Sequence, residues 1–215
     1  MKDLYEEYQT ALELLNSGNS KNEKKAAKML KTLAKKNYIQ AINTYGYCYD
    51  YGVGVEKDAE KAFKLYLTAA EQGLAKSQSN VGNCYALGIG IEINEKEAVK
   101  WWKRAAEQGH AKAQNSLGIS YRDGKGIEKN IEEAVKWYTK SANQGYSLAQ
   151  CNLGMCYEYG EGVEVDLEKA YKLYLESAKQ GNKQAILNLA SCYENGKGVK
   201  KNLDIANELY AKAKA

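Results

Sequence analysis

Residues 111–145 read AKAQNSLGISYRDGKGIEKNIEEAVKWYTKSANQG, and this stretch decides the fold because the chain repeats it. The closing Gln-Gly pair recurs every 36 residues, at Gln72, Gln108, Gln144 and Gln180. Four further positions keep the same spacing through five units without an insertion, and in the quoted unit they are Tyr121, Gly124, Gly126 and Ala134. Self-similarity at a fixed period of this length is the sequence signature of a repeat protein.

Each unit predicts two helices joined by a glycine loop. Gln78, Val81 and Tyr85 fall on one face of a helix over residues 75–87. The two loop glycines then fit a helix stop and turn, because glycine readily adopts φ > 0. Next, Asn94 stands at an N-cap position with Glu97 three residues later, a capping box for a second helix over about 95–108. The equivalent caps in the other units are Asp58, Asn130 (with Glu133), Asp166 and Asn202.

The period divides the chain into one worn copy and five clear units. We expect a single repeat domain over 1–215, with a degenerate N-terminal capping repeat at 1–35 and repeats at 36–71, 72–107, 108–143, 144–179 and 180–215. In the worn copy, Asn22 and Ala26 align with the cap Asn94 and with Ala98. Asn16 and Gly18 stand where the two loop glycines are expected.

Small residues recur on the first helix of each unit, at Gly46, Gly82, Gly118, Gly154 and Ala190. Small side chains let two helix axes approach closely. The recurring tyrosines, Tyr49 to Tyr193 in steps of 36, are expected to fill the space between hairpins. Because one hairpin cannot bury both of its faces, neighbouring hairpins must stack.

Composition excludes several classes of function. The chain has 31 Lys and Arg residues against 27 Asp and Glu residues, a net charge of +4. That balance is too even for a nucleic-acid-binding arm or a polybasic membrane anchor. The sequence has no run of the roughly 20 apolar residues that a membrane helix needs, and the start MKDLYEEYQT has no signal-peptide core. We therefore expect a cytoplasmic protein with reduced thiols, no nucleic-acid partner and no membrane partner.

Four of the five cysteines share one repeat position, at Cys48, Cys84, Cys156 and Cys192, and Ser120 takes that position in the remaining unit. Equivalent positions in stacked hairpins lie roughly 9–10 Å apart by helix packing, which is too far for a disulfide. These cysteines are therefore expected to fill small buried slots. Cys151 falls outside that position and is expected to be exposed.

No constellation in the sequence predicts catalysis. His110 is the single histidine and is expected in a surface loop, and the chain has no HExxH or CxxC pattern. The GxG loop recurs in every unit and lacks the third glycine of a nucleotide fingerprint. No Ser/His/Asp or Cys/His set can be assembled. We expect no catalytic residue, no cofactor and no metal, and hence no enzyme.

The quoted unit resembles a Sel1-like repeat, a relative of the tetratricopeptide repeat with a longer glycine loop. The resemblance is clear over 36–215 and weak over 1–35. It implies an all-α, right-handed α/α superhelical solenoid of about six 36-residue helix hairpins, serving as an adaptor or scaffold for other proteins. Members of that family act in stress and degradation pathways, in bacterial signalling and in host–pathogen contacts.

By analogy with tetratricopeptide arrays, the first helices are expected to line a concave face that binds the partner. The residues expected there vary between units while the frame does not, and they are Tyr47, Lys76, Asn80, Asn83, Lys112, Asn115, Ile119, Arg122, Leu148, Cys151, Asn152, Met155, Leu187 and Asn188. The second and third clear units contribute cationic and amide side chains, and the fourth and fifth contribute apolar ones. The expected ligand is a peptide with an acidic end and a hydrophobic segment.

Two questions stay open at this point. Asn80, Asn152 and Asn188 form a neighbouring row, and their amides suit either hydrogen bonds between repeats or clamping of a peptide backbone. The expected function is a non-catalytic scaffold that binds a protein or peptide in the groove. The alternative is an inhibitory, immunity or regulatory subunit that binds a folded enzyme or toxin with its convex face or loops. Self-association through the end hairpins is a further kind of partnership to test.

Overall fold

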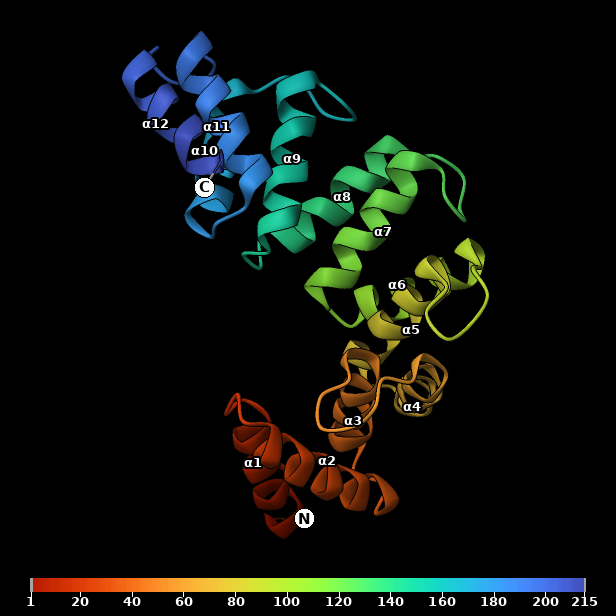
Figure 1. Ribbon diagram of the computed structural model, residues 1–215. Helices are drawn as coiled ribbons and strands as arrows, with labels where there is room; N and C mark the ends of the chain where they lie inside the picture. Colours follow the sequence, from red (N-terminus) through yellow and green to blue (C-terminus); the bar gives the residue numbers. More distant parts are fainter. Residues whose placement is uncertain (1, 215) are drawn as a thin grey trace. The chain divides into compact units, whose positions relative to one another are not determined.

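The computed structural model describes residues 2–214, which form twelve α-helices and no strand (Figure 1). Odd-numbered helices are the first helices of hairpins, and even-numbered helices are the second. Their bounds are α1 Lys2–Leu15, α2 Ser20–Lys35, α3 Ile39–Tyr51, α4 Ala59–Glu71, α5 Ala75–Leu87, α6 Glu95–Glu107, α7 Ala111–Asp123, α8 Ile131–Ala142, α9 Ser147–Tyr159, α10 Leu167–Lys179, α11 Lys183–Asn195 and α12 Leu203–Lys214. The helix predicted over 75–87 is confirmed as α5.

The chain divides into two compact units, Met1–Gln108 and Gly109–Ala215. The first unit contains the hairpins α1–α2, α3–α4 and α5–α6, and the second contains α7–α8, α9–α10 and α11–α12. Within each unit, the second helix of one hairpin also packs on the first helix of the next. This consecutive packing confirms the predicted all-α array of helix hairpins. The boundaries predicted in 36-residue steps stay a prediction.

Glycine ends the first helices and Asx caps begin the second ones, as the sequence predicts. Each of α3, α5, α7, α9 and α11 ends at a left-handed glycine, namely Gly52, Gly88, Gly124, Gly160 and Gly196. The predicted caps Asp58, Asn94, Asn130, Asp166 and Asn202 each accept a hydrogen bond from the backbone N–H three residues later. Local chemistry therefore sets both ends of the loop.

Only half of the predicted capping box forms. The Asn94 side-chain oxygen accepts from the N–H of Glu97, but the N–H of Asn94 itself donates to the Tyr85 carbonyl at 2.8 Å. The Glu97 carboxylate instead pairs with Lys100 at 2.6 Å. Asn130 and Glu133 repeat this arrangement. Because the first helix already supplies an acceptor for the cap N–H, the glutamate is left for the lysine.

The first hairpin departs from the predicted register. Its second helix α2 begins at Ser20, and the cap is Asn19, whose side-chain oxygen accepts from the N–H groups of Lys21 and Asn22. Asn22, which aligns with the cap Asn94 in sequence, is therefore not the cap. Without the paired loop glycines, the connection shortens to a tight turn, and α2 extends by one turn toward it. Asn22 lies inside that added turn.

The second loop glycine makes a contact between repeats. A Cβ atom at Gly90 would lie 2.1 Å from the carbonyl oxygen of Ala59, the first residue of α4. A Cβ atom at Gly198 would lie 2.0 Å from the carbonyl oxygen of Leu167, the first residue of α10. Both glycines also have positive φ. Each loop therefore closes its own hairpin and seats it on the preceding one.

The small residues of the first helices face aromatic rings. A Cβ atom at Gly154 would lie 2.6 Å from the ring of Tyr174, and one at Gly118 would lie 2.6 Å from the ring of Tyr138. The ring belongs to the second helix of the same hairpin and lies flush on the first helix because the glycine has no side chain. The close approach predicted from the small residues is therefore an approach of ring to backbone.

The tyrosines that recur every 36 residues fill the core between hairpins, as predicted, and so do the cysteines. Tyr49 packs against the buried clusters on both of its sides, and so does Tyr157. All five cysteines are buried and free, including the four that share one repeat position, and Ser120 is buried in the fifth slot. The prediction that Cys151 is exposed was wrong, since its residue exposure is 3%.

Candidate functional site: the first-helix face

The predicted partner-binding residues all lie on first helices, α3 and α5 in one unit and α7, α9 and α11 in the other. Twelve of them are exposed or half-buried, and we call these the first-helix face. Its residues are Tyr47, Lys76, Asn80 and Asn83 in Met1–Gln108, and Lys112, Ile119, Arg122, Leu148, Asn152, Met155, Leu187 and Asn188 in Gly109–Ala215. The other two predicted residues, Asn115 and Cys151, are buried.

Asn115 and Cys151 are buried because their repeat position faces the next first helix rather than solvent. The Asn152 amide on α9 donates to Asn115 Oδ1 at 2.9 Å, and the Asn188 amide on α11 lies 3.8 Å from the Cys151 sulfur. Leu187 occupies the same position in α11, which is the last first helix among the described residues, and it is 38% exposed. The two buried side chains therefore serve packing between repeats.

The asparagine row forms hydrogen bonds between consecutive repeats. In the first unit, the Asn80 amide donates to Asn43 Oδ1 at 3.0 Å, and the Ser77 hydroxyl donates to the same oxygen at 2.9 Å. Asn152 and Asn188 make the equivalent contacts in the second unit. The repeat-stabilising interpretation of this row is therefore confirmed. Clamping of a peptide by the remaining amide groups stays a prediction.

In the unit Met1–Gln108, the face presents aromatic and polar side chains. The rings of Tyr47 and Tyr51 lie 4.5 Å apart, and both side chains are exposed. Asn83 accepts a hydrogen bond from the indole N–H of Trp102 at 3.1 Å, so its acceptor oxygen is partly used within the hairpin. Lys76 is exposed and forms no ion pair with the described residues. A partner here would meet two rings and one cation.

In the unit Gly109–Ala215, cationic and apolar side chains lie on neighbouring helices. Lys112 and Arg122 stand on α7, the exposed Leu148 and the half-buried Met155 on α9, and the exposed Leu187 on α11. Arg122 pairs with its neighbour Asp123, with 2.7 Å between Nε and Oδ1. The hydrogen bonds from Asn152 and Asn188 show that α9 contacts α7 and that α11 contacts α9. The unit Gly109–Ala215 therefore carries both the cationic and the apolar residues of the predicted binding face.

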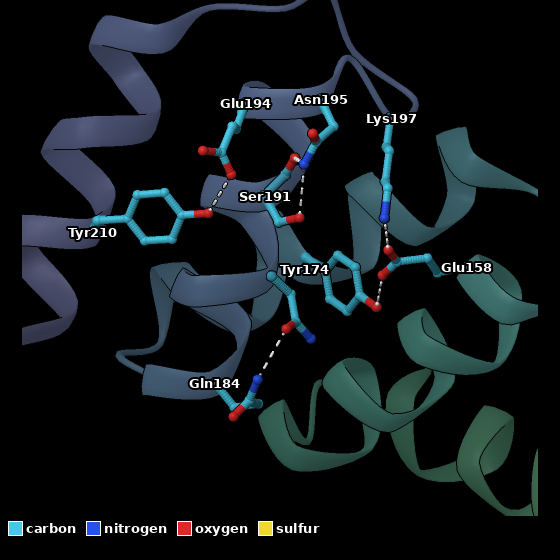
Figure 2. A network of polar contacts seen from close by, with 9 residues as sticks. Glu158, Tyr174, Gln184, Ser191, Glu194, Asn195, Lys197 and Tyr210 are labelled. Atoms are coloured by element: carbon cyan, nitrogen blue, oxygen red, sulfur yellow. Dashed lines mark hydrogen bonds and ion pairs between the residues drawn. The ribbon is translucent and has the colours of Figure 1, made fainter.

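Sequence reasoning missed a set of acidic acceptors near the C-terminal ends of the first helices. Figure 2 shows Glu158 between Tyr174 and Lys197, with the Tyr174 hydroxyl donating at 2.7 Å and the Lys197 ammonium at 2.6 Å. The Tyr210 hydroxyl donates to Glu194 at 2.8 Å in the next hairpin (Figure 2). Asp50, Glu158 and Glu194 share one repeat position, and this spacing was the signal that could have found them.

These contacts shift the titration of the groups involved. Burial, then the hydrogen bond to Glu158, raises the pKa of Tyr174. The hydrogen bond to Glu158 likewise raises the pKa of Lys197, so the ammonium stays charged at any ordinary pH. The Glu158 side chain is only 7% exposed. A carboxylate this buried needs its two donors, since an unpaired buried charge is strongly destabilising.

The cysteine thiols and the single histidine have structural surroundings. Burial raises the pKa of Cys48, Cys151, Cys156 and Cys192 to about 11 and that of Cys84 to about 12, so these thiols are protonated at neutral pH. His110 is the N-cap of α7, and its Nδ1 accepts from the Ala113 N–H at 3.3 Å. Within residues 2–214, no three His, Cys, Asp or Glu side chains are grouped closely enough to hold a metal ion.

A cavity of about 680 Å³ lies between α2, α3 and the loop that follows α3. Lys24 and Lys28 stand on one side of it, and Tyr45 and Tyr49 on another. Ala27, which also lines the cavity, occupies the repeat position that holds Phe63 and Tyr171 in two other hairpins, where the larger rings meet the next tyrosine edge-on. Separately, no helix within residues 2–214 combines the length and the apolar character needed to cross a membrane.

Tandem helix hairpins of fixed length, joined by a paired-glycine loop and stacked through small residues, define a helical repeat protein. The sequence profile of the Sel1 repeat matches five times, at residues 39–74, 75–110, 111–146, 147–182 and 183–215. The chain therefore belongs to the Sel1 repeat family. Proteins built from these repeats are generally scaffolds for protein interactions.

Solved structures agree with this assignment. A Sel1 repeat protein from Oxalobacter formigenes is 40% identical, with a TM-score of 0.86 over 97% of this chain and 82% of that one. The protective antigen c5321 of uropathogenic Escherichia coli is 33% identical, with a TM-score of 0.83 over 98% of this chain and 45% of that one. The immunity protein Pa5087 from Pseudomonas aeruginosa, 21% identical with a TM-score of 0.64 over 98% of this chain and 81% of that one, shows the fold alone. No curated protein matches the chain.

Proposed function

We propose that this protein is a non-catalytic scaffold whose first-helix face binds a segment of another protein. The observation that carries the proposal is the composition of that face in Gly109–Ala215. There, Lys112 and Arg122 lie on α7, Leu148 on α9 and Leu187 on α11, and each of these helices contacts the next. Exposed leucines on a rigid helical frame, flanked by cations, suit a partner with apolar and acidic residues.

The mechanism is binding to a surface that exists before the partner arrives. The asparagine hydrogen bonds join consecutive first helices, and the glycine–ring contacts hold each first helix on the second helix of its own hairpin. A preorganised surface lowers the entropic cost of binding a flexible segment. The cations orient the segment and raise its association rate, and the leucines supply the buried apolar area. The same reasoning favours a protein partner over a nucleic acid or a membrane.

The five free cysteines support a cytoplasmic location, because cysteines without disulfide bonds are typical of reducing compartments. Their protonated state and their burial also support a structural role over a catalytic one. The proposal therefore assigns no catalytic residue, cofactor or metal to the chain.

A matched pair of variants tests the proposal. The face variant carries Lys112→Glu, Leu148→Asp and Leu187→Asp. The control variant carries Lys129→Glu, Val165→Asp and Leu203→Asp, which changes the charge equally at exposed loop and helix-start positions of the same unit. Circular dichroism first establishes that both fold. Quantitative mass spectrometry of proteins captured from an extract of the native cells should then show a partner lost by the face variant and kept by the control.

The second candidate function, an inhibitory or immunity subunit that binds a folded enzyme or toxin, has one observation in its favour. Apolar side chains are exposed around two of the glycine loops, with Leu87 and Ile93 at one loop and Val165 and Leu167 at the other. Such loops suit a folded partner more than an extended peptide. In the experiment above, loss of the partner by the control variant alone would favour this function and overturn the first. Sedimentation of the purified protein tests self-association.

A further inference from the structure

One set of aromatic side chains, spaced by 36 residues on the second helices, has a recurring hydrogen-bond acceptor. Tyr66 donates to Asp50, Tyr174 to Glu158 and Tyr210 to Glu194, always 16 residues back in the sequence. In the hairpin α5–α6 the aromatic residue is Trp102, and its indole N–H donates to Asn83. Figure 2 shows two of these pairs, those of Glu158 and Glu194. The chain thus supplies an acceptor from the adjacent first helix in four of five hairpins.

The exception is Tyr138 in the hairpin α7–α8. Its side chain is fully buried, and its hydroxyl has no hydrogen-bond partner among the described residues. The residue 16 positions earlier is Arg122, a donor in place of an acceptor. Leaving a buried hydroxyl unpaired is destabilising, so such groups are rare in folded proteins.

The Tyr138 ring is placed like its equivalent in the next hairpin. Gly118 lies under Tyr138 as Gly154 lies under Tyr174, with the same 2.6 Å separation of an added Cβ from ring atom Cε1. The Tyr174 hydroxyl reaches the residue four positions after that glycine, which is Glu158. By the same geometry, the Tyr138 hydroxyl lies at Arg122. Burial raises the pKa of Tyr138, and the charge of Arg122 opposes this effect by lowering it. The effect of Arg122 agrees with a Tyr138 hydroxyl that lies near the guanidinium.

Arg122 is weakly engaged. Its guanidinium pairs with Asp123, the adjacent residue at the end of α7, and both side chains are about one third exposed. Exposed ion pairs of this kind contribute little to stability. A guanidinium has five N–H donors, and the contacts with Asp123 engage two of its nitrogens. Arg122 can therefore exchange Asp123 for another carboxylate at small cost.

We propose that Arg122 and Tyr138 together receive a carboxylate of the segment that binds the first-helix face. The carboxylate takes the place that Glu158 fills in the next hairpin, accepting from the Tyr138 hydroxyl, and Arg122 adds charge-assisted hydrogen bonds. Arg122 swings away from Asp123 and uncovers the hydroxyl as the carboxylate enters. This inference rests on the proposed function, and it specifies the anionic group of the ligand.

The chain contains one internal competitor, Glu161. It lies in the loop after α9, at the repeat position that holds Lys197 in the next hairpin, where that lysine pairs with Glu158. Glu161 is exposed and makes no ion pair with the described residues. If Glu161 were the group that occupies the site, Glu161→Gln would destabilise the protein and strengthen binding of an added carboxylate. Our proposal expects no loss of stability from Glu161→Gln.

Small probes test the site in the full chain without a known partner. Acetyl-glutamate amide supplies a side-chain carboxylate, acetyl-alanine supplies a terminal carboxylate, and acetyl-glutamine amide is the neutral control. At millimolar concentrations, at least one acid should shift the NMR signals of the Arg122 Nε–H and the Tyr138 ring, and the neutral amide should not. The acid that shifts them distinguishes a side chain from a chain terminus as the source. Equal shifts by the neutral amide, or none by either acid, would overturn the proposal.

A charge exchange supplies the second test. Arg122→Glu with Glu161→Lys rebuilds at Tyr138 the arrangement that Glu158 and Lys197 make at Tyr174. We expect this double variant to unfold about 2–4 °C higher than the wild type and to lose the probe-induced shifts. Equal or lower thermal stability would show that the Tyr138 hydroxyl already has an acceptor in the wild type. If the probes bind but the first-helix face captures no partner, the proposed function is wrong and the carboxylate site stands. If the face captures a partner but the probes do not bind, the carboxylate site is wrong and the proposed function stands.

Discussion

The Tyr174 hydroxyl donates to Glu158 at 2.7 Å, while the equivalent hydroxyl of Tyr138 has no partner among the described residues. Both rings are fully buried, and both lie on a glycine of the preceding helix. At the position that would accept from these hydroxyls, the two hairpins differ, because Glu158 in one corresponds to Arg122 in the other. This difference gives a matched experiment inside one chain.

Removing the two hydroxyls should have opposite consequences. Tyr174→Phe removes a donor from the buried Glu158 carboxylate and should destabilise the protein by about 1.5–3 kcal/mol, as expected for a hydrogen bond to a charged group. Tyr138→Phe removes an unpaired polar atom and should be neutral or stabilising. Chemical denaturation of both variants measures the difference. A loss of the same size in both variants would contradict the assigned hydrogen bonding.

The loop glycines should differ in their tolerance of alanine. Gly198 and Gly181 both have positive φ, but a Cβ atom at Gly198 would collide with the Leu167 carbonyl, and nothing lies within 4 Å of one at Gly181. Gly181→Ala should therefore lower the free energy of unfolding only by the cost of placing alanine in the left-handed conformation, roughly 1–2 kcal/mol. Gly198→Ala should lose about 3 kcal/mol or more, because the contact with the preceding hairpin must open. Thermal unfolding of the pair checks this. Similar losses would show that the loop does not seat one repeat on another.

The asparagine row should contribute to stability through its contacts between repeats. Asn152→Ala removes the donor to Asn115, whose side chain is 4% exposed, and leaves that buried amide with one partner fewer. We expect a loss of about 1–2 kcal/mol. Asn195→Ala, at an exposed position bonded only within α11, is the control and should change stability by less than about 0.5 kcal/mol. If Asn152→Ala behaves like this control, the row does not hold the repeats together.

The cysteines should be unreactive in the folded chain and should make stability depend on alkaline pH. An unfolded thiol ionises near pH 8.5, whereas burial raises the pKa of Cys151 and Cys156 to about 11. Between these values the unfolded state binds fewer protons than the folded state. This contribution is therefore fully present below about pH 8.5 and is lost as the pH rises toward 11.

Two readouts check the thiols. The melting temperature should fall between pH 9 and 11, and a chromogenic thiol reagent at pH 8 should modify none of the five cysteines until denaturant is added. Rapid modification of Cys151 in the native protein would show that this side chain is exposed, as the sequence analysis predicted, and not buried.

Much of the fold was predictable because the signals are local and repeated five times. Spacing gave the repeat register, glycines with positive φ gave the helix ends, and Asx residues gave the caps. The worn first copy lacks the paired glycines that fix the register of the others, so its cap is Asn19, and Asn22, which aligns with Asn94, lies inside the helix. The second half of the capping box failed because the Tyr85 carbonyl, nine residues before Asn94, reaches the cap N–H first.

The site was predicted less completely, and the reason is geometric. Periodicity shows which residues share a helix face, but a first helix has one face toward its own hairpin and another toward the next repeat. Asn115 and Cys151 lie on that second contact, so they vary in type and yet are buried. Glu158 and its two donors come from three separate segments, and no pattern within one unit joins them.

Site-specific photo-crosslinking tests the central claim, that the first-helix face binds the partner, most directly. A photoreactive amino acid replaces Leu148 on that face, Val165 in a loop or Lys172 on the second helix α10, all exposed positions of one unit. After irradiation in the native cell extract, we expect a specific covalent adduct from position 148 and none from position 172. Adducts from position 165 or 172 with none from 148 would contradict the claim and move the binding surface to the loops or the second helices.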